Sequence, residues 1–338
     1  MSRITYIDTI KALLIILVIV GHCHSVNEIP FLRNAIYSFH MPLFFIISGF
    51  FFKPLSVNDG LKKYSKTYLV PYFITVVIAL CLVSLISLFI TPSPEKQLIN
   101  GSLLTEWFVR AGFASGWGWS KFLGEVPIIG PVWFLWGLFF SKLIYTYIGS
   151  RWNGIEKWII TLLIFSFAIW SIKLVQLPFS LQSGCFGMVY IMFGYYIRKF
   201  DLIQTFSKLS PIYILILCGL WGLAVYEGGY NLGCCLIGGF LPFVMSFILS
   251  LMILSYFYLH PNFLEKLGRV IGNHTLSILC AHSIFHYIQY MYGDYWTFLN
   301  FNPIVNLIIE AFLEFSIAIA GSYLLQYLPL TRKVFINK

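Results

Sequence analysis

The first long apolar segment of the chain contains two polar side chains whose types and spacing could do chemistry. Residues 6–24 are almost entirely apolar, yet Lys11 and His22 lie inside this run. In a helix, eleven residues bring the two side chains to within about 20° of one azimuth and about 16 Å apart along the axis. Polar groups are costly inside a membrane, so both indicate function. A neutral imidazole can accept a hydroxyl proton at neutral pH, which predicts that His22 is a catalytic base.

A plainer interpretation covers part of this pattern. Asp8 lies three residues before Lys11, and an ion pair at that spacing would make a cationic helix start tolerable. A histidine near a helix end is also often only an interfacial residue. The ion pair explains Lys11, but it leaves His22 unexplained.

The other histidines in apolar segments are weaker candidates. His40 lies at the outer end of the second apolar segment, beside a proline, and could orient His22 or line the path of the acceptor. His282 lies in the ninth segment with His286 one turn further on, and this spacing can chelate a metal. We expect no metal, because no carboxylate or thiol partner is evident in the sequence. His24 follows His22 by two residues, which places it on another face of a helix as an interfacial side chain.

Composition indicates the elements that must position these residues. Of the 338 residues, 59% are hydrophobic and 10% are charged, which leaves too few charges to cover a water-soluble globule. Apolar runs of about 18 residues, enough to cross about 30 Å of hydrocarbon, recur along the chain. We therefore expect an all-α polytopic membrane bundle that forms one domain over 1–338, with no appended soluble domain. Its predicted helices, about ten crossings, are 5–24, 35–52, 68–91, 131–148, 157–175, 181–197, 211–226, 235–259, 274–292 and 304–328.

The basic residues predict the orientation of this bundle. With a cytoplasmic N-terminus, the inner segments hold seventeen of the 22 lysines and arginines, and the outer segments hold five. This bias predicts that both termini are cytoplasmic, and it accounts for the net charge of +9 without nucleic acid. The long connection 92–130 then lies outside, either as an amphipathic stretch in the headgroup region or as a lid that admits substrate.

Several segments together resemble the bacterial acyltransferase-3 family, from about residue 3 to about residue 290. The first is the basic residue, ten intervening residues and histidine of Lys11 to His22. The others are Phe39-His40-Met41-Pro42 with Ser48-Gly49-Phe50, Lys62-Lys63-Tyr64-Ser65-Lys66 followed by Pro71, Pro131-Val132-Trp133-Phe134-Leu135, and Gly272-Asn273-His274-Thr275-Leu276-Ser277 with His282.

The resemblance implies a membrane-bound O-acyltransferase of the bacterial inner membrane. Its donor would be a cytoplasmic acyl-CoA, with acetyl-CoA expected, and its acceptor a sugar hydroxyl of an envelope polysaccharide or of a lipid-linked precursor. The catalytic candidates are His22, Lys11, His40 and His282. The donor phosphates would need the inner basic residues Lys62, Lys63 and Lys66, together with Lys11. The family often has arginines in this cluster, and lysine lacks their bidentate fork.

Two other classes of protein fit part of the same pattern. A glycan or lipid transporter or flippase would also use many helices with charges inside the membrane. The chain has no second copy of the Lys11 to His22 pattern, which disfavours an internally repeated transporter. A membrane sensor is a third interpretation. Consumption of an acyl-CoA thioester would separate the enzyme from both. The acceptor sugar, and acetyl against succinyl or another acyl group, stay open.

Overall fold

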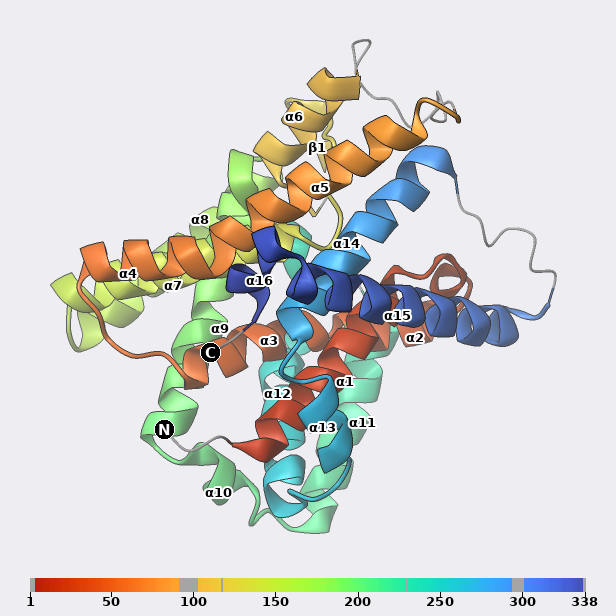
Figure 1. The fold of residues 1–338 in the computed structure, drawn as a ribbon. Helices are drawn as coiled ribbons and strands as arrows, with labels where there is room; N and C mark the ends of the chain where they lie inside the picture. Colours follow the sequence, from red (N-terminus) through yellow and green to blue (C-terminus); the bar gives the residue numbers. More distant parts are fainter. Residues whose placement is uncertain (1–3, 91–102, 117, 229, 294–300, 337–338) are drawn as a thin grey trace.

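The computed structural model describes residues 4–90, 103–116, 118–228, 230–293 and 301–336. They form a bundle of helices (Figure 1). Its only strands, within these ranges, are the hairpin of β1 (Trp119–Ser120) with β2 (Gly124–Glu125) and that of β3 (Tyr230–Asn231) with β4 (Leu236–Ile237).

Each of the ten predicted helices corresponds to at least one helix of the structure. In chain order the helices are α1 (Thr5–His22), η1 (His24–Glu28), α2 (Pro30–Tyr37), α3 (His40–Phe50), α4 (Val57–Tyr64), η2 (Ser65–Leu69), α5 (Val70–Ile86), α6 (Leu103–Phe113), α7 (Trp133–Arg151), α8 (Ile155–Ile172), η4 (Pro178–Ser180), α9 (Leu181–Lys199), α10 (Leu202–Phe206), α11 (Pro211–Glu227), η5 (Leu232–Cys234), α12 (Phe240–Leu259), α13 (Glu265–Val270), α14 (Thr275–Tyr292), α15 (Pro303–Tyr327) and α16 (Pro329–Phe335).

Local sequence explains where several helices begin. A proline lies in the first turn of α2, α11, α15 and α16, where its missing N–H and fixed φ favour a helix start. The Asn302 side chain accepts a hydrogen bond from the Val305 N–H at 2.9 Å and so caps α15. The predicted helix 235–259 begins only at Phe240, because Gly238 and Gly239 have positive φ values of 58° and 144° after the β3–β4 hairpin.

Two differences from the predicted helices shape the site. The predicted helix 35–52 is divided into α2 and α3, because Phe39 leaves helical geometry at φ −142° and ψ −25°. The predicted third helix is preceded by α4 and by the π-helical turn η2. Pro71, just after this turn, has no N–H for a bond to the preceding turn, and π-helical turns are frequent at functional sites.

The chain is a multi-pass membrane protein. Five described helical segments are long and apolar enough to cross a membrane: Thr5–His22, Val57–Ile86, Ile155–Ile172, Phe240–Leu259 and Pro303–Tyr327. The helices α7, α9 and α14 have 19, 19 and 18 residues, and most of their side chains are buried in the bundle. The total of about ten crossings and the orientation of the termini remain predictions.

Helix α9 lies at the centre of one half of the bundle, packed against α3, α7 and α8. A Cβ atom at Gly49 of α3 would lie 2.1 Å from the Ile191 carbonyl oxygen, and one at Gly194 of α9 would lie 2.0 Å from the Ile46 carbonyl oxygen. The two backbones are therefore in direct contact, as small residues allow between membrane helices.

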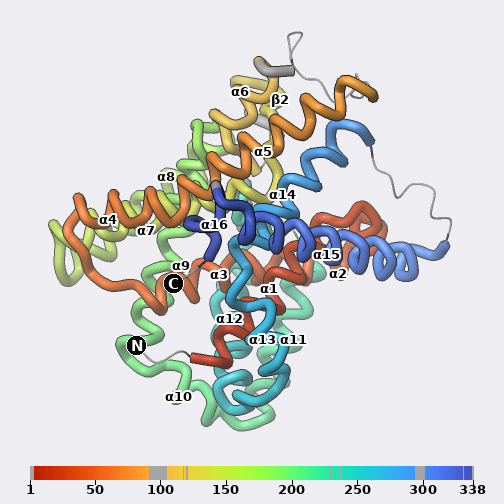
Figure 2. The backbone as a smooth tube through the Cα atoms, in the orientation of Figure 1, coloured from red at the N-terminus to blue at the C-terminus, as the bar shows by residue number. Residues whose placement is uncertain are grey.

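Helix α1 is held in the other half of the bundle. Figure 2 shows it running beside α12 and α13, with the short α13 leading into α14. A Cβ atom at Gly272, just after α13, would lie 2.1 Å from the Asp8 carbonyl oxygen. The start of α1 is therefore fixed by backbone contact as well as by its buried aliphatic side chains.

The connection 92–130 contains helix α6, although residues 92–102 and 117 lie outside the described residues. Glu106 and Arg110 form a buried ion pair of 2.6 Å. The Trp107 ring lies 4.0 Å from the Tyr287 ring of α14, between centroids. This face of α6 is therefore packed into the bundle. The predicted location of the connection outside the membrane is not tested by these contacts.

Candidate active site

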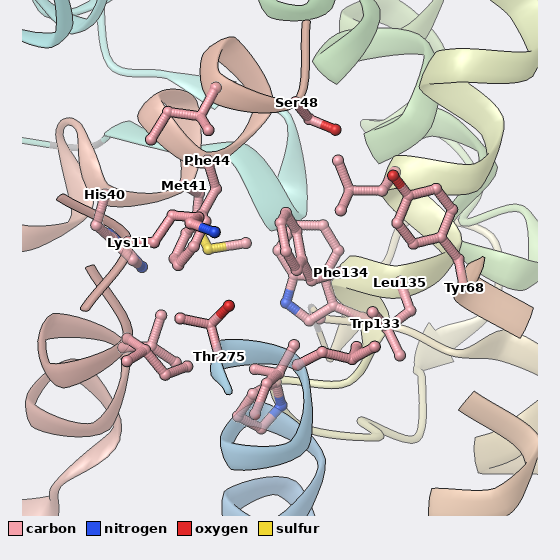
Figure 3. Close-up of a pocket in the computed structure, with 18 of the residues that line it drawn as sticks. Lys11, His40, Met41, Phe44, Ser48, Tyr68, Trp133, Phe134, Leu135 and Thr275 are labelled. Atoms are coloured by element: carbon pink, nitrogen blue, oxygen red, sulfur yellow. The ribbon is translucent and has the colours of Figure 1, made fainter. Parts of the chain in front are cut away.

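A cavity of about 390 Å³ lies between α1, α3, η2, α7 and the start of α14. We call it the lysine cavity, because Lys11 and Lys142 both line it. Figure 3 shows part of its wall, with Lys11, Ser48, Tyr68 and Thr275 around a largely apolar space. The apolar side chains of this wall include Ile15, Val18, Met41, Phe44, Ile47, Phe134, Leu135, Leu138 and Leu279.

Lys11 and His22 both line the lysine cavity, as their spacing in a helix predicted. The Lys11 Nζ atom lies 2.8 Å from an Asp8 carboxyl oxygen, so the predicted ion pair is confirmed. A charge held by a partner on its own helix can face a membrane cavity at lower cost than an isolated one. Lys11 therefore supplies a positive charge toward the N-terminal end of α1, and His22 ends the same helix.

A backbone contact fixes the tautomer of His22. Its Nδ1 atom lies 2.8 Å from the Val18 carbonyl oxygen one turn earlier. A carbonyl oxygen can only accept a hydrogen bond, so Nδ1 carries the proton and donates it. In the neutral imidazole, Nε2 then has the free lone pair. The fold therefore presents His22 in the form that a general base requires.

Two histidines of α14 lie against His22. The ring centroids of His22 and His286 are 5.3 Å apart, and those of His22 and His282 are 5.7 Å apart. His282 is completely buried, and its Nδ1 atom lies 3.7 Å from a carboxyl oxygen of Glu314. His282 therefore lies behind His22, outside the walls of the lysine cavity, and would act on a substrate only through His22.

His40 lines the lysine cavity at the first residue of α3. Its Nδ1 atom donates to the Ile36 carbonyl oxygen at 2.7 Å, and its ring packs edge-on against Tyr37 at 5.1 Å. The Tyr37 hydroxyl in turn donates to the Gly21 carbonyl oxygen at 3.1 Å. The break between α2 and α3 thus places His40 near the end of α1 that carries His22.

The predicted phosphate-binding lysines lie elsewhere. Lys62, Lys63 and Lys66 are exposed on α4 and η2 and do not line the lysine cavity. Thr67 and Tyr68, next to them in the chain, do line it. The basic cluster therefore occupies a surface that adjoins the cavity wall.

Sequence reasoning missed Lys142, the second cation of this cavity. Its Nζ atom lies 5.7 Å and 5.6 Å from the ring centroids of Tyr64 and Tyr68, and both Lys142 and Ser48 interact with the Tyr68 hydroxyl. Lys142 is one of the seventeen basic residues of the inner segments and lies within the predicted helix 131–148. Its position within that apolar run was a signal that it faces the bundle interior.

A second, smaller cavity of about 180 Å³ lies on the other side of His22. We call it the glutamate cavity, because Glu310 and Glu314 of α15 line it. His22 lines both cavities. The remaining walls of the glutamate cavity are His24, Asn27, His286, Gln289, Tyr290 and Gly293.

The two glutamates are held by hydrogen bonds. The backbone N–H groups of His24 and Ser25 donate to the two carboxyl oxygens of Glu310, at 3.0 Å for Ser25. Gln289 donates to Glu314 at 3.2 Å. The Cys23 thiol also lies near both, since the three potential ligand atoms are within 4.8 Å of one another. The two backbone N–H donors hold both oxygens of Glu310 in place and leave each oxygen able to accept a further hydrogen bond.

One comparison with known proteins identifies the family of this chain. The sequence profile of the acyltransferase domain, the acyltransferase-3 type, matches residues 4–327. The chain belongs to the acyltransferase-3 family. Comparisons with curated proteins and with solved structures gave no match.

Family membership makes the chain a membrane acyltransferase with an acyl donor and an acyl acceptor. Among the described residues, the acyltransferase has a cavity with two cations, a wall of apolar side chains and a histidine of fixed tautomer at its far end. Such a cavity can hold an anionic headgroup at one place and a reactive carbonyl at another.

Proposed function

We propose that the acyltransferase transfers an acetyl group from cytoplasmic acetyl-CoA to a sugar hydroxyl. The acceptor would be an envelope polysaccharide or its lipid-linked precursor, and the location a bacterial inner membrane. The observation that carries this proposal is the hydrogen bond from His22 Nδ1 to the Val18 carbonyl, because it leaves Nε2 as a proton acceptor beside a cavity that contains lysines.

The reaction then needs few groups. His22 Nε2 removes the proton of the sugar hydroxyl as the oxygen attacks the carbonyl carbon of the thioester, and the new C–O bond forms. The C–S bond breaks, and the proton on Nε2 passes to the departing thiolate. The products are an acetyl ester and free CoA thiol, with no net gain or loss of protons and no metal or redox step.

The cavity walls suit the different parts of the donor. The CoA phosphates are strong acceptors for the lysine ammonium groups. Lys142 lies at the wall next to η2, and Lys63 and Lys66 lie on the adjoining surface. The apolar side chains of α3 and α7 fit the pantetheine arm. Lys11 supplies a further positive charge on the helix that ends at His22.

Acetyl-CoA consumption by the purified protein tests the proposed function. In vesicles supplied with labelled acetyl-CoA and a sugar acceptor, we expect label in an ester of the sugar and release of free thiol. The variant His22→Ala should lose this activity, while His260→Ala, which changes an exposed histidine at the end of α12, should retain it. A protein that moves a glycan across the vesicle and leaves acetyl-CoA intact would be a transporter, and the proposal would be wrong.

The proposed orientation has its own test. In a background without the exposed Cys81 and Cys218, single cysteines replace the exposed Lys121 and Lys266. An impermeant thiol reagent added to intact cells should label the first position and spare the second. The reverse pattern would invert the bundle and place the donor on the wrong side.

A further inference from the structure

The glutamate cavity differs in chemistry from the cavity that the donor would occupy. We infer that it is the acceptor subsite, and that it takes an uncharged sugar and excludes uronic acids and other acidic sugars. This inference rests on the proposed function and adds to it the chemical class of the acceptor. It begins from one observation: His22 is a wall of both cavities.

The position of His22 explains why two cavities are needed. A base must contact the acceptor hydroxyl while the thioester carbonyl lies within reach of the same oxygen. The lysine cavity reaches His22 from the side of Lys11, and the glutamate cavity reaches it from the far end of α1, at His24 and Asn27. A hydroxyl group in the second cavity and a thioester in the first could therefore meet at one imidazole.

The walls of the glutamate cavity suit hydroxyl groups. Glu310 and Glu314 present carboxyl oxygens that accept hydrogen bonds, and Asn27 and Gln289 contribute amide groups. A sugar ring carries several O–H donors, and hydrogen bonds to carboxyl groups are among the stronger ones in proteins. The glutamates are also fixed in place, because the backbone of η1 and the Gln289 side chain donate to them.

The charges of the same walls disfavour an anion. Of the described residues that line the glutamate cavity, none is a lysine or an arginine. The neighbouring Arg110 contacts the Tyr290 ring, 4.7 Å from its centroid, but forms its ion pair with Glu106. An acidic sugar would bring a further carboxylate against the carboxyl groups of Glu310 and Glu314 in a buried site, where an additional unpaired anion is costly. The same cost would keep the CoA phosphates in the lysine cavity.

A matched pair of probes tests this inference. Methyl glucoside and methyl glucuronide share one ring and differ by a carboxylate in place of a hydroxymethyl group. With the purified enzyme at saturating acetyl-CoA, we expect kcat/KM for the glucoside to exceed that for the glucuronide by about tenfold or more. Equal values would overturn the inference and leave the proposed function standing. Failure to acetylate either glycoside, with acetyl-CoA left intact in the vesicle assay as well, would overturn the proposed function and, with it, the inference. Transfer in the vesicle assay but to neither glycoside would overturn the inference alone.

Two variants connect the selectivity to this cavity. Glu314→Gln keeps an oxygen that can accept from Gln289 and removes a negative charge, so the ratio of glucoside to glucuronide should fall several-fold. Asn27→Lys adds a cation to the wall at an exposed position, where a substitution does not disturb the buried core. It should lower the ratio of glucoside to glucuronide further. The acetyl-CoA KM should stay unchanged in both. A ratio that neither variant changes would place acceptor selection elsewhere and refute the inference.

Discussion

The lysine cavity and the glutamate cavity meet at one imidazole and carry opposite charges. Lys11 and Lys142 line the first, whereas Glu310 and Glu314 line the second. The first has a long apolar wall from α3 and α7, and the second is small and largely polar. The walls of a single site could not be complementary both to a polyanionic donor and to a hydroxyl-rich acceptor. Two cavities with one shared residue would let each cavity bind one of the two proposed substrates.

In the proposed mechanism, one base serves both cavities. The Nδ1–H of His22 is committed to the Val18 carbonyl, so neither cavity needs to supply a partner that fixes the tautomer. The walls of each cavity are then free to recognise a substrate. This separation predicts that substitutions at His22 and at the two sets of walls have distinct kinetic effects.

The largest expected effect is that of His22→Ala, because it removes the residue that both cavities share. We expect kcat to fall by about 10²- to 10⁴-fold, the usual contribution of a general base, with acetyl-CoA binding nearly unchanged. Single-turnover rates and a separate binding measurement on the purified protein check this, and His260→Ala serves as the matched control. A fully active, folded His22→Ala variant would show that another residue, such as His40, is the base.

A smaller effect is expected from Lys142→Met, which removes a cation from the lysine cavity and keeps a long apolar stem. The acetyl-CoA KM should rise by about tenfold or more, as for loss of a hydrogen bond to a charged group, while kcat at saturating donor changes little. Lys173→Met, at an exposed lysine on the end of α8, is the control. An equal fall in kcat with constant KM would assign Lys142 to the chemical step.

The smallest effect is expected from the double variant Lys63→Ala/Lys66→Ala. Both lysines are exposed, and exposed charges act through water and salt. The acetyl-CoA KM should rise by about two- to fivefold at low ionic strength, and the difference from the unmodified protein should shrink as salt is added. A donor KM that is unchanged at low salt would remove this surface from the donor site.

The sequence predicted the parts of the site that one helix carries. Lys11 and His22 share a face by helical geometry alone, and the Asp8 ion pair follows from a three-residue spacing. The spacing could not show that α14 and α15 bring His286 and Glu314 to the same place, since these contacts depend on how the helices pack. The division of α2 from α3 at Phe39 was missed although the sequence contains a signal for it: Pro42 has no N–H for a helical bond to the Ser38 carbonyl four residues earlier.

The sequence also contains a signal for the two glutamates of α15. Glu310 and Glu314 lie four residues apart within the apolar run of α15, so they fall on one helical face, and carboxyl groups inside a membrane segment indicate a functional or paired site. Their partners were unpredictable, since Glu310 accepts from the backbone of His24 and Ser25, more than 280 residues away in the chain.

The glycine contacts of α3 with α9 fix the width of one wall of the lysine cavity. Gly49 and Gly194 set the spacing of the two helices by backbone contact, so the frame that carries Phe44 and Ile47 has a fixed width. Side chains on that frame can be exchanged for larger or smaller ones without moving it. The shape of the wall proposed for the pantetheine arm would then depend on a few replaceable side chains on α3 and α7, while the frame and His22 stay the same.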